Sequence, residues 1–309
     1  MLVICPHCKK NHSIDEKKIP ANAKKARCTS CGQSFALDIK RPVKEEKKEK
    51  PVQKSDGVAR KIGVSLSKGG VGKSTTAINL SAGLALAGFK VLLVDTDTQG
   101  QDSFMLGVKP KAGLTELVTG ELSLKECLTK ARENLWLLAG GKALAGIKRM
   151  IDRKDYGGEM TISEALTPVD KLFDFVIVDT SPGWDPLTVN VLFYVNELMI
   201  PVALEIMSLQ GLSEFLRSIS SIQKYRPELG LKYIVPTFED KRVKKTSRIL
   251  HKIGKIYGER LCHPIRYNVR LSEAPAYGKS IYEYAPGCNG AHDYRELVRK
   301  VANNPKLLS

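Results

Sequence analysis

The chain has 309 residues, of which 42% are hydrophobic and 27% are charged, enough for one large α/β domain and a small module. No stretch approaches about eighteen consecutive apolar residues, and the N-terminus lacks the apolar core of a secretory signal, so we expect neither a transmembrane helix nor a signal peptide. The net charge of +16 favours a polyanionic partner, either nucleic acid or an anionic membrane surface. The seven unevenly placed cysteines argue against a disulfide framework.

Residues 1–39 contain two C-x2-C pairs, Cys5–Cys8 and Cys28–Cys31, with nineteen residues between them. Two such tight pairs can place four thiolates tetrahedrally around Zn²⁺. A module this small has too little core to fold alone, so metal binding would supply much of its stability. His7 and His12 could replace a thiol as ligand, but we expect both to be solvated. Chance cysteines or a redox pair are the alternative interpretation.

The same segment resembles a family of short zinc ribbons. Its pattern is C-P-x-C, then a stretch like IDEKKIP at 14–20, then C-x-x-C-G-x-x-F at 28–35. This resemblance implies a zinc site but not what the ribbon binds. The other cysteines, Cys127, Cys262 and Cys288, have no close cysteine partner, and we expect them to be buried and inert.

Residues 40–60 are rich in charge and almost free of large apolar side chains, which predicts a flexible linker. From 61 to 309, short apolar runs alternate with longer amphipathic stretches. This rhythm predicts an α/β fold with a doubly wound, mostly parallel sheet covered on both faces. The expected strands lie at 62–66, 91–95, 135–139, 175–179, 197–202 and 232–236.

A glycine-rich loop follows the first of these strands and precedes a helical stretch. Such a loop turns backbone N–H groups toward phosphate oxygens, and the helix N-terminus adds partial positive charge there. Lys73 would reach the β- and γ-phosphates of a nucleotide, and the Ser74 hydroxyl would ligate Mg²⁺. The usual first glycine of the motif is replaced by Ser67, and a second lysine stands beside it. The expected nucleotide-binding residues are Lys68, Gly69, Gly70, Val71, Gly72, Lys73, Ser74 and Thr75.

Acidic residues end two further expected strands. The run 91–95 leads into two carboxylates on alternate residues, Asp95 and Asp97, and the run 175–179 ends in Asp179. Ligands of parallel sheets bind at the carboxyl ends of the strands, so all three strand ends should converge on one nucleotide. Asp179 suits the outer shell of Mg²⁺, and Asp97 suits orienting the attacking water.

A basic run at 241–255 has seven Lys or Arg residues and no acid, spaced so that several share one helical face. It contains the candidate DNA-binding residues Lys241, Arg242, Lys244, Lys245, Arg248 and Lys252. Near the C-terminus, Tyr294, Leu297, Val298 and Val301 recur at helical spacing. We expect these four to face the core rather than to form a membrane-binding helix.

These motifs together resemble the ParA/Soj partition ATPases, within the MinD/ParA group that has a deviant Walker A loop. The matching pieces are KGGVGKST at 68–75, VLLVDTDTQG at 91–100, FDFVIVDTSPG with LTVNVL at 173–192, NVRLSEAPAYGKSI at 268–281 and GAHDYREL at 290–297. The last two are typical of the ParA branch. The resemblance covers residues 62–303.

This resemblance implies a mechanism. ATP binding would drive dimerisation, with Lys68 reaching the partner's phosphates, Lys73 acting in its own site, and Asp97 linked to hydrolysis. The dimer would bind duplex DNA without sequence preference, with Arg270 as a further contact. A ParB-like or other partner would stimulate hydrolysis. ATP, Mg²⁺ and Zn²⁺ are the expected cofactors, and the expected location is cytoplasmic and nucleoid-associated, without stable membrane insertion.

The chain departs from the family at two places. Thr98 stands where the family usually has proline, and Arg266 replaces the proline of an I-P-R-N motif whose proline and asparagine border the adenine. Asn268 is retained, so we expect Arg266 and Asn268 beside the base.

Three functions remain open from the sequence. The leading interpretation is an ATPase switch that segregates or positions a chromosome, plasmid or protein cargo. The second is a zinc-ribbon regulator or adaptor that uses the ATP site as a nucleotide sensor. The third is a metal-cluster carrier. It is disfavoured because its relatives place paired cysteines within or after the ATPase core.

Overall fold

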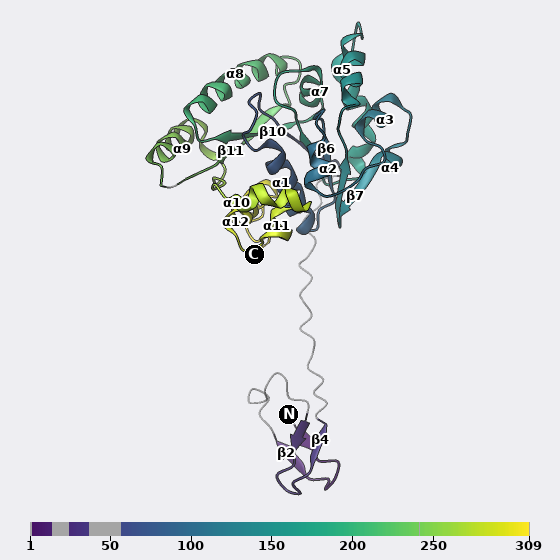
Figure 1. Ribbon diagram of the computed structural model, residues 1–309, viewed down its shortest axis with the longest axis vertical. Coiled ribbons are helices and arrows are strands. Elements are labelled where there is room, and N and C mark those ends of the chain that lie inside the picture. Colours follow the sequence, from purple (N-terminus) through teal and green to yellow (C-terminus); the bar gives the residue numbers. More distant parts are fainter. Residues whose placement is uncertain (1, 14–24, 37–56, 241, 309) are drawn as a thin grey trace. The chain divides into compact units, whose positions relative to one another are not determined.

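A computed structural model describes residues 2–13, 25–36, 57–240 and 242–308. The chain divides into two compact units, Met1–Val52 and Gln53–Ser309 (Figure 1). Residues 40–56 of the expected linker lie outside the described residues. In the larger unit, Ala59 is buried and the first strand begins at Arg60.

The smaller unit consists of two antiparallel hairpins. Strand β1 (Leu2–Ile4) pairs with β2 (Asn11–Ser13), and β3 (Lys25–Arg27) pairs with β4 (Ser34–Ala36). Each hairpin turns through one of the C-x2-C pairs. Lys9 in the first turn and Gly32 in the second have positive φ angles of 58° and 73°, which the tight return of the chain requires.

A seven-stranded sheet forms the centre of the larger unit, with the order β11-β10-β5-β9-β6-β8-β7. The six predicted strands are present, and all six are parallel, which confirms the predicted fold class. Strands β6 and β9 lie in the middle of the sheet and are buried along their full length. The strands are β5 (Arg60–Val64), β6 (Val91–Asp95), β8 (Leu135–Leu138), β9 (Phe175–Asp179), β10 (Glu197–Ala203) and β11 (Gly230–Thr237).

One strand was not predicted. The edge strand β7 (Leu128–Arg132) pairs antiparallel with β8 through a tight turn in which Asn134 has a φ of 57°. Its sequence, LTKAR, lacks a continuous apolar run because an edge strand buries only part of its surface.

Helices surround this sheet (Figure 1). The longer ones are α1 (Lys73–Leu86), α5 (Leu144–Asp152), α7 (Pro186–Tyr194), α8 (Ile206–Ile222), α9 (Lys244–Tyr257) and α12 (Asn289–Val301). The shorter ones are α2 (Gln101–Met105), α3 (Leu114–Thr119), α4 (Leu124–Cys127), α6 (Thr161–Leu166), α10 (Val269–Glu273) and α11 (Ile281–Tyr284).

The C-terminal helices pack against α1, the helix that follows the glycine-rich loop. The buried Asn79 of α1 accepts a hydrogen bond from the Ile281 backbone N–H, and Thr76 lies within hydrogen-bond distance of the Tyr294 hydroxyl. The four apolar residues of α12 that were expected to face the core are all buried, with exposures of 1% or less. The C-terminal segment therefore supports the helix that begins at the loop.

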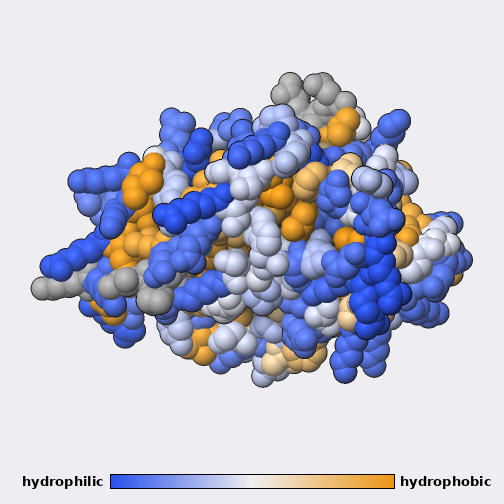
Figure 2. Space-filling model, turned by 90° about the horizontal axis from the view of Figure 1, so that it is seen from above, coloured by the Kyte–Doolittle hydropathy of each residue, from blue (hydrophilic) through white to orange (hydrophobic). Residues whose placement is uncertain are grey.

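In the described ranges, no helix combines the length and the apolar character needed to cross a membrane. The molecular face in Figure 2 is largely hydrophilic, with hydrophobic atoms in separate patches between polar side chains.

Candidate nucleotide and metal sites

The four paired cysteines converge in the smaller unit. Their sulfur atoms all lie within 4.8 Å of one another, and the Cys5–Cys31 and Cys8–Cys28 sulfur pairs are each 3.7 Å apart. A tetrahedron with metal–sulfur bonds of about 2.3 Å has edges of about 3.8 Å, so this spacing fits one zinc-sized ion. Backbone N–H groups of Cys31 and Ser30 lower the pKa of Cys28 to about 5, whereas the pKa of Cys31, against the opposing effect of the Gln33 backbone N–H, is raised to about 11 by burial and the neighbouring thiols. The four sulfur atoms are thus close enough to compete for protons.

His12 differs from the expected solvated side chain. It is half-buried, and its Nε2 lies 3.3 Å from the Cys28 sulfur, whereas His7 is exposed as expected. A second contact joins His12 Nδ1 to the Thr29 hydroxyl at 3.4 Å. The imidazole thus adjoins the cluster without being one of its four sulfur donors.

The other cysteines only partly match the expectation of buried thiols. Cys127 and Cys262 are buried, and burial raises the pKa of both thiols. Cys288 is half-buried instead, because its sulfur accepts a hydrogen bond from the Ala291 backbone N–H at the start of α12.

The glycine-rich loop connects β5 to α1. Gly70 and Gly72 have φ angles of 70° and 90°, a conformation that side-chain-bearing residues rarely adopt. The buried Lys73 donates from Nζ to the Lys68 carbonyl oxygen at 2.9 Å, which holds this side chain across the loop. Burial lowers the pKa of Lys73, although Asp179 and Asp97 oppose the shift.

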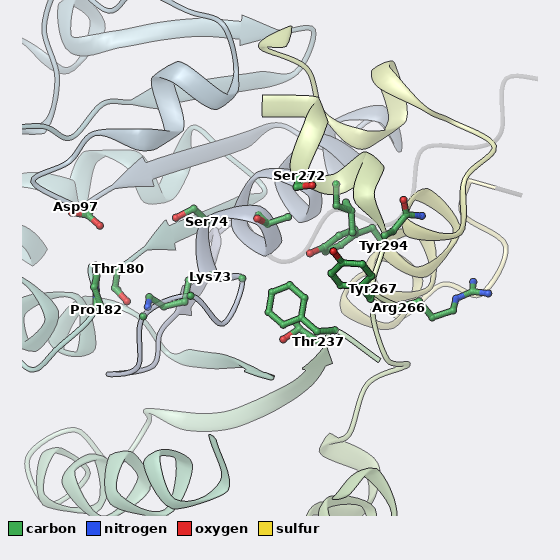
Figure 3. A pocket seen from close by; sticks show the side chains of 17 residues that line it. Lys73, Ser74, Asp97, Thr180, Pro182, Thr237, Arg266, Tyr267, Ser272 and Tyr294 are labelled. Carbon is green, nitrogen blue, oxygen red and sulfur yellow. The ribbon is translucent and has the colours of Figure 1, made fainter. Parts of the chain in front are cut away.

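A pocket of about 460 Å³ opens beside this loop (Figure 3). Its phosphate-loop wall contains most of the predicted nucleotide-binding residues, namely Gly69, Gly70, Gly72, Lys73, Ser74 and Thr75, and Asp97 and Pro182 lie on the same side. Val71 is buried and does not line the pocket. The opposite wall comes from the end of β11 and from the segment that leads into α10, with Thr237, Phe238, Tyr267, Asn268 and Leu271. The cavity has room for a nucleotide between these two walls.

The predicted acidic strand ends converge on this pocket. Asp95 and Asp179 are paired neighbours in the register of β6 and β9, and both side chains are 1% exposed. Ser74 donates from its hydroxyl to Asp179 Oδ2 at 2.6 Å. The other Asp179 oxygen has no hydrogen-bond partner among the described residues. Burial, and then the charge of Asp95, raises the pKa of Asp179 to about 8.

Asp95 holds the loop that contains Asp97. Its two oxygens accept hydrogen bonds from the backbone N–H groups of Asp97 at 2.8 Å and of Asp102 at 3.3 Å. Gly140 packs against the same loop so closely that an added Cβ would lie 2.7 Å from the carbonyl oxygens of Asp95 and Asp97. Asp95 and Gly140 are therefore site residues that the predicted set omitted. The available signals were the D-x-D spacing and the Gly-Gly pair after β8.

Asp102 was also missed. It is fully buried in α2, and neither of its carboxylate oxygens has a hydrogen-bond partner among the described residues. Burial, followed by the charges of Asp95 and Asp179, raises its pKa well above the usual range of a carboxyl. Nothing in the local sequence QDSF indicates this burial, because α2 is only five residues long.

Lys68, unlike Lys73, is not among the residues that line the pocket. Its Nζ donates to the Ser208 hydroxyl at 3.1 Å and lies 3.4 Å from Glu205 Oε2. Both partners lie at the start of α8, and Lys68 remains about one-third exposed. This lysine is thus held near the surface of its own chain.

The two residues expected beside the base differ in what their side chains do. Both line the pocket, but the Arg266 guanidinium pairs with the buried Asp293 of α12 and extends away from Lys73 in Figure 3. Asn268 Oδ1 accepts the Arg270 backbone N–H and so caps α10. Phe238 and Tyr267, absent from the predicted set, supply exposed rings at this end of the pocket, 43% and 62% exposed respectively.

The basic run forms part of helix α9. Lys245, Arg248 and Lys252 are exposed, whereas Ile249 and Ile253 of the same helix are buried. Lys244 begins the helix, and Lys241 lies outside the described residues.

Two further predicted basic residues are paired. Arg242 is exposed and hydrogen-bonds to Asp240, and Arg270 of α10 pairs with Glu273 at 2.9 Å. Arg270 belongs to α10 rather than to α9, and it is not among the residues that line the nucleotide pocket.

Comparisons with known proteins agree with this geometry. A family model described as an AAA domain matches residues 59–231, and one described as a zinc-ribbon domain matches residues 1–36. The chromosome-partitioning ATPase Soj of Treponema pallidum is 35% identical over 238 residues, which cover 76% of this chain and 93% of that protein. Soj of Thermus thermophilus is 36% identical and covers 78% and 95% respectively.

The chain belongs to the ParA/Soj family of partition ATPases. It is an ATP hydrolase of this family with an N-terminal zinc-ribbon segment. Among solved structures, the ADP- and magnesium-bound cobyrinic acid a,c-diamide synthase of Mycobacterium smegmatis is 30% identical, with a TM-score of 0.66 over 78% of this chain and 92% of that one. McdA of Cyanothece, solved as an ATP complex of a D38A variant, shares the fold, with a TM-score of 0.72 at 20% identity over 82% of this chain and all of that one.

The unpartnered Asp102 of this ParA/Soj protein generates a prediction about pH. The folded chain keeps a proton on Asp102 that the unfolded chain releases above about pH 4, so this group lowers the stability of the fold as the pH rises. Asp102→Asn removes that dependence. We expect Asp102→Asn to increase the free energy of unfolding, and thus the stability of the fold, by a larger amount at pH 8 than at pH 5.

Urea denaturation at the two pH values measures this difference. Glu133→Gln, which neutralises an exposed acid, serves as the control and should leave the pH dependence of the parent unchanged. An identical effect of Asp102→Asn at pH 5 and pH 8 would show that Asp102 does not titrate between them.

Proposed function

We propose that this chain is an ATP-dependent dimerising ATPase that binds duplex DNA without sequence preference and segregates or positions a cargo. The observation that carries the proposal is a pocket lined by Lys73, Ser74 and Asp97, in which Ser74 is hydrogen-bonded to Asp179, with a second lysine of the same loop, Lys68, held against the start of α8. The names of the Soj relatives support the partition role, and the structural similarity to McdA supports the fold.

In this proposal each residue of the pocket has one task. Backbone N–H groups of 69–75 and the Lys73 ammonium bind the phosphates, and the Ser74 hydroxyl with Asp179 holds Mg²⁺. The bound ion neutralises charge that develops on the transferred phosphoryl group. Asp97 orients the attacking water, since its backbone is fixed by Asp95. Lys68 leaves Glu205 and Ser208 to reach the phosphates of a second protomer.

The arrangement of charge supports the choice of Mg²⁺ as the partner of this cluster. Asp95 and Asp179 are both 1% exposed and Asp97 lines the pocket beside them, whereas Lys73 is the nearby buried cation among the described residues. A divalent cation of oxygen-ligand preference would offset the excess of carboxylates. Asp179 Oδ1, which has no hydrogen-bond partner, offers a lone pair for a water in the ion's shell.

The exposed basic side chains of α9 support the proposed DNA contact. Their side chains are exposed to solvent while the isoleucines of the helix are buried, and the run from 242 to 257 contains no acid that would repel phosphates. Phosphate contacts of this kind give affinity and salt dependence but no sequence readout. A ParB-like or other stimulating partner, and association with the nucleoid, belong to the same proposal.

The smaller unit is proposed to bind one Zn²⁺ through Cys5, Cys8, Cys28 and Cys31. The sulfur spacing described above fits tetrahedral coordination, and His12 would contact the Cys28 thiolate from outside the ligand set. Zinc would then stabilise a unit whose described strands are only three residues long.

Replacing Lys68 tests the dimer. We expect Lys68→Ala to abolish ATP-dependent dimerisation, because the partner's phosphates lose their contact in trans. The matched variant Asp97→Ala should dimerise like the parent but hydrolyse ATP at least about tenfold more slowly, as is usual when a group that positions the nucleophile is lost. Light scattering with ATP and a phosphate-release assay measure the two effects. A Lys68→Ala protein that still dimerises, or an Asp97→Ala protein with parental turnover, would refute the corresponding role.

Removing charge from α9 tests the DNA surface. The double variant Arg248→Ala, Lys252→Ala should bind duplex DNA less tightly in the presence of ATP, and the slope of log affinity against log salt should fall by about two. The control variant Lys109→Ala, Lys125→Ala removes the same charge from exposed positions elsewhere. Fluorescence anisotropy over a salt series gives both quantities. Equal losses in the two variants would show that only net charge matters.

The zinc site is tested by metal content. The parent should carry about one zinc per chain, and Cys28→Ser should lose it, because hydroxyl oxygen is a poor replacement for thiolate. Cys288→Ser, which keeps a polar cap on α12, should retain the metal. Elemental analysis after dialysis measures the content, and full zinc retention by Cys28→Ser would remove this cysteine from the ligand set.

A further inference from the structure

His12 contacts the cysteine cluster of the smaller unit, and the four-sulfur site leaves this contact without a task. The residue lies in the middle of β2, opposite Val3 in the first hairpin. Cys28 follows β3 in the second hairpin. The 3.3 Å contact between His12 Nε2 and Cys28 Sγ therefore links one hairpin to the other beside the cluster.

The strand pattern directs this imidazole inward. Asn11 and Ser13 are exposed, whereas His12 between them is half-buried, as expected for alternate residues of a strand. A polar ring in that position needs hydrogen-bond partners for its nitrogens. The second hairpin supplies both of them: Cys28 Sγ lies beside Nε2, and the Thr29 hydroxyl lies 3.4 Å from Nδ1.

The chemistry of these two partners fixes how the imidazole is used. A cysteine that binds zinc is a thiolate, which accepts hydrogen bonds and cannot donate one. Nε2 must therefore be the protonated nitrogen, and its N–H donates to Cys28 Sγ. In a neutral imidazole the other nitrogen is then an acceptor, so the Thr29 hydroxyl donates to Nδ1. Thr29 thus holds the tautomer that His12 needs for its contact with the thiolate.

Cys28 depends on such donors more than an exposed thiolate would. The residue is only 3% exposed, so water has little access to it. Four thiolates also outweigh the two charges of a zinc ion, which leaves the centre net negative. The Ser30 backbone N–H donates to Cys28 Sγ at 3.4 Å, and His12 adds a second N–H from the other hairpin. Hydrogen bonds of this kind offset part of the charge on a sulfur ligand and fix its position.

We propose that His12 is a positioning residue for zinc: its neutral imidazole donates Nε2–H to the Cys28 thiolate and thereby strengthens metal binding. This inference rests on the proposed zinc site, and it gives a task to a residue outside the four ligands. Loss of a hydrogen-bond partner of a metal ligand typically weakens metal affinity by about tenfold to a hundredfold, and the same range is expected here.

The zinc affinity of the full-length protein, measured by competition with a fluorescent chelator, tests the proposal. His12→Phe keeps a planar ring but removes the N–H, and we expect it to bind Zn²⁺ at least about tenfold more weakly than the parent. His12→Gln places an amide donor at a similar reach and should recover most of the loss. His7→Phe makes the same change at the exposed histidine of the first turn and should keep the parental affinity.

Two further measurements respond to the hydrogen bonds rather than to packing. Thr29→Val removes the hydroxyl that holds Nδ1, so it should weaken zinc binding in the parent but have no further effect when combined with His12→Phe. Co²⁺ bound in place of zinc reports the ligand set through its visible spectrum. This spectrum should be that of four sulfur ligands in both the parent and His12→Phe.

The outcomes separate this proposal from the zinc site on which it rests. A parent that binds no zinc contradicts both. A parent that binds zinc, with His12→Phe at parental affinity or His12→Gln as weak as His12→Phe, overturns only the role of the N–H donor. Equal losses in His12→Phe and His7→Phe overturn it too, and additive effects of Thr29→Val and His12→Phe would show that the hydroxyl does not act through the imidazole. A cobalt spectrum that changes in His12→Phe would make His12 a ligand, against the proposal.

Discussion

The imbalance of charge at the carboxyl ends of β6 and β9 governs the rest of the larger unit. Asp95 and Asp179 are neighbours in the register of the two central strands, where they cannot be solvated. Backbone N–H groups of the 97–102 loop turn toward Asp95, and the Ser74 hydroxyl turns toward Asp179. The phosphate loop and the loop that contains Asp97 are thus both organised around carboxylates that the sheet places side by side.

The local parts of this arrangement could be predicted from the sequence. Strands β6 and β9 are apolar up to their final aspartate, and the end of β5, at 62–64, is apolar. The glycine-rich loop and the D-x-D spacing lie next to these strands in the chain, so short-range patterns are sufficient. The same holds for the paired cysteines. The expected convergence of three strand ends follows from the topology of a parallel sheet, which fixes where successive strands end.

Contacts between distant segments could not be predicted in the same way. Arg266 hydrogen-bonds to Asp293, which is twenty-seven residues away in the sequence. The packing of α12 brings this carboxylate to Arg266, so the guanidinium pairs with it and does not point toward a base in the nucleotide pocket. Asp102 is buried because α2 packs against α1 and against the turn at Ala274–Tyr277, although its local sequence is polar. The edge strand β7 has too weak a pattern to be recognised, since half of its surface faces solvent.

The contact of Lys68 with Glu205 and Ser208 has a thermodynamic consequence for assembly. A lysine that already has a carboxylate and a hydroxyl beside it gives these up when it engages another protomer, so the step exchanges one set of contacts for another. The free energy gained on association is therefore the difference between the contacts of Lys68 with the other protomer and its contacts with Glu205 and Ser208. It is smaller than the full free energy of the contacts formed with the other protomer. An association built on such an exchange is readily reversed when the anion in the partner site changes, which suits a protein whose work depends on repeated cycles of joining and separating.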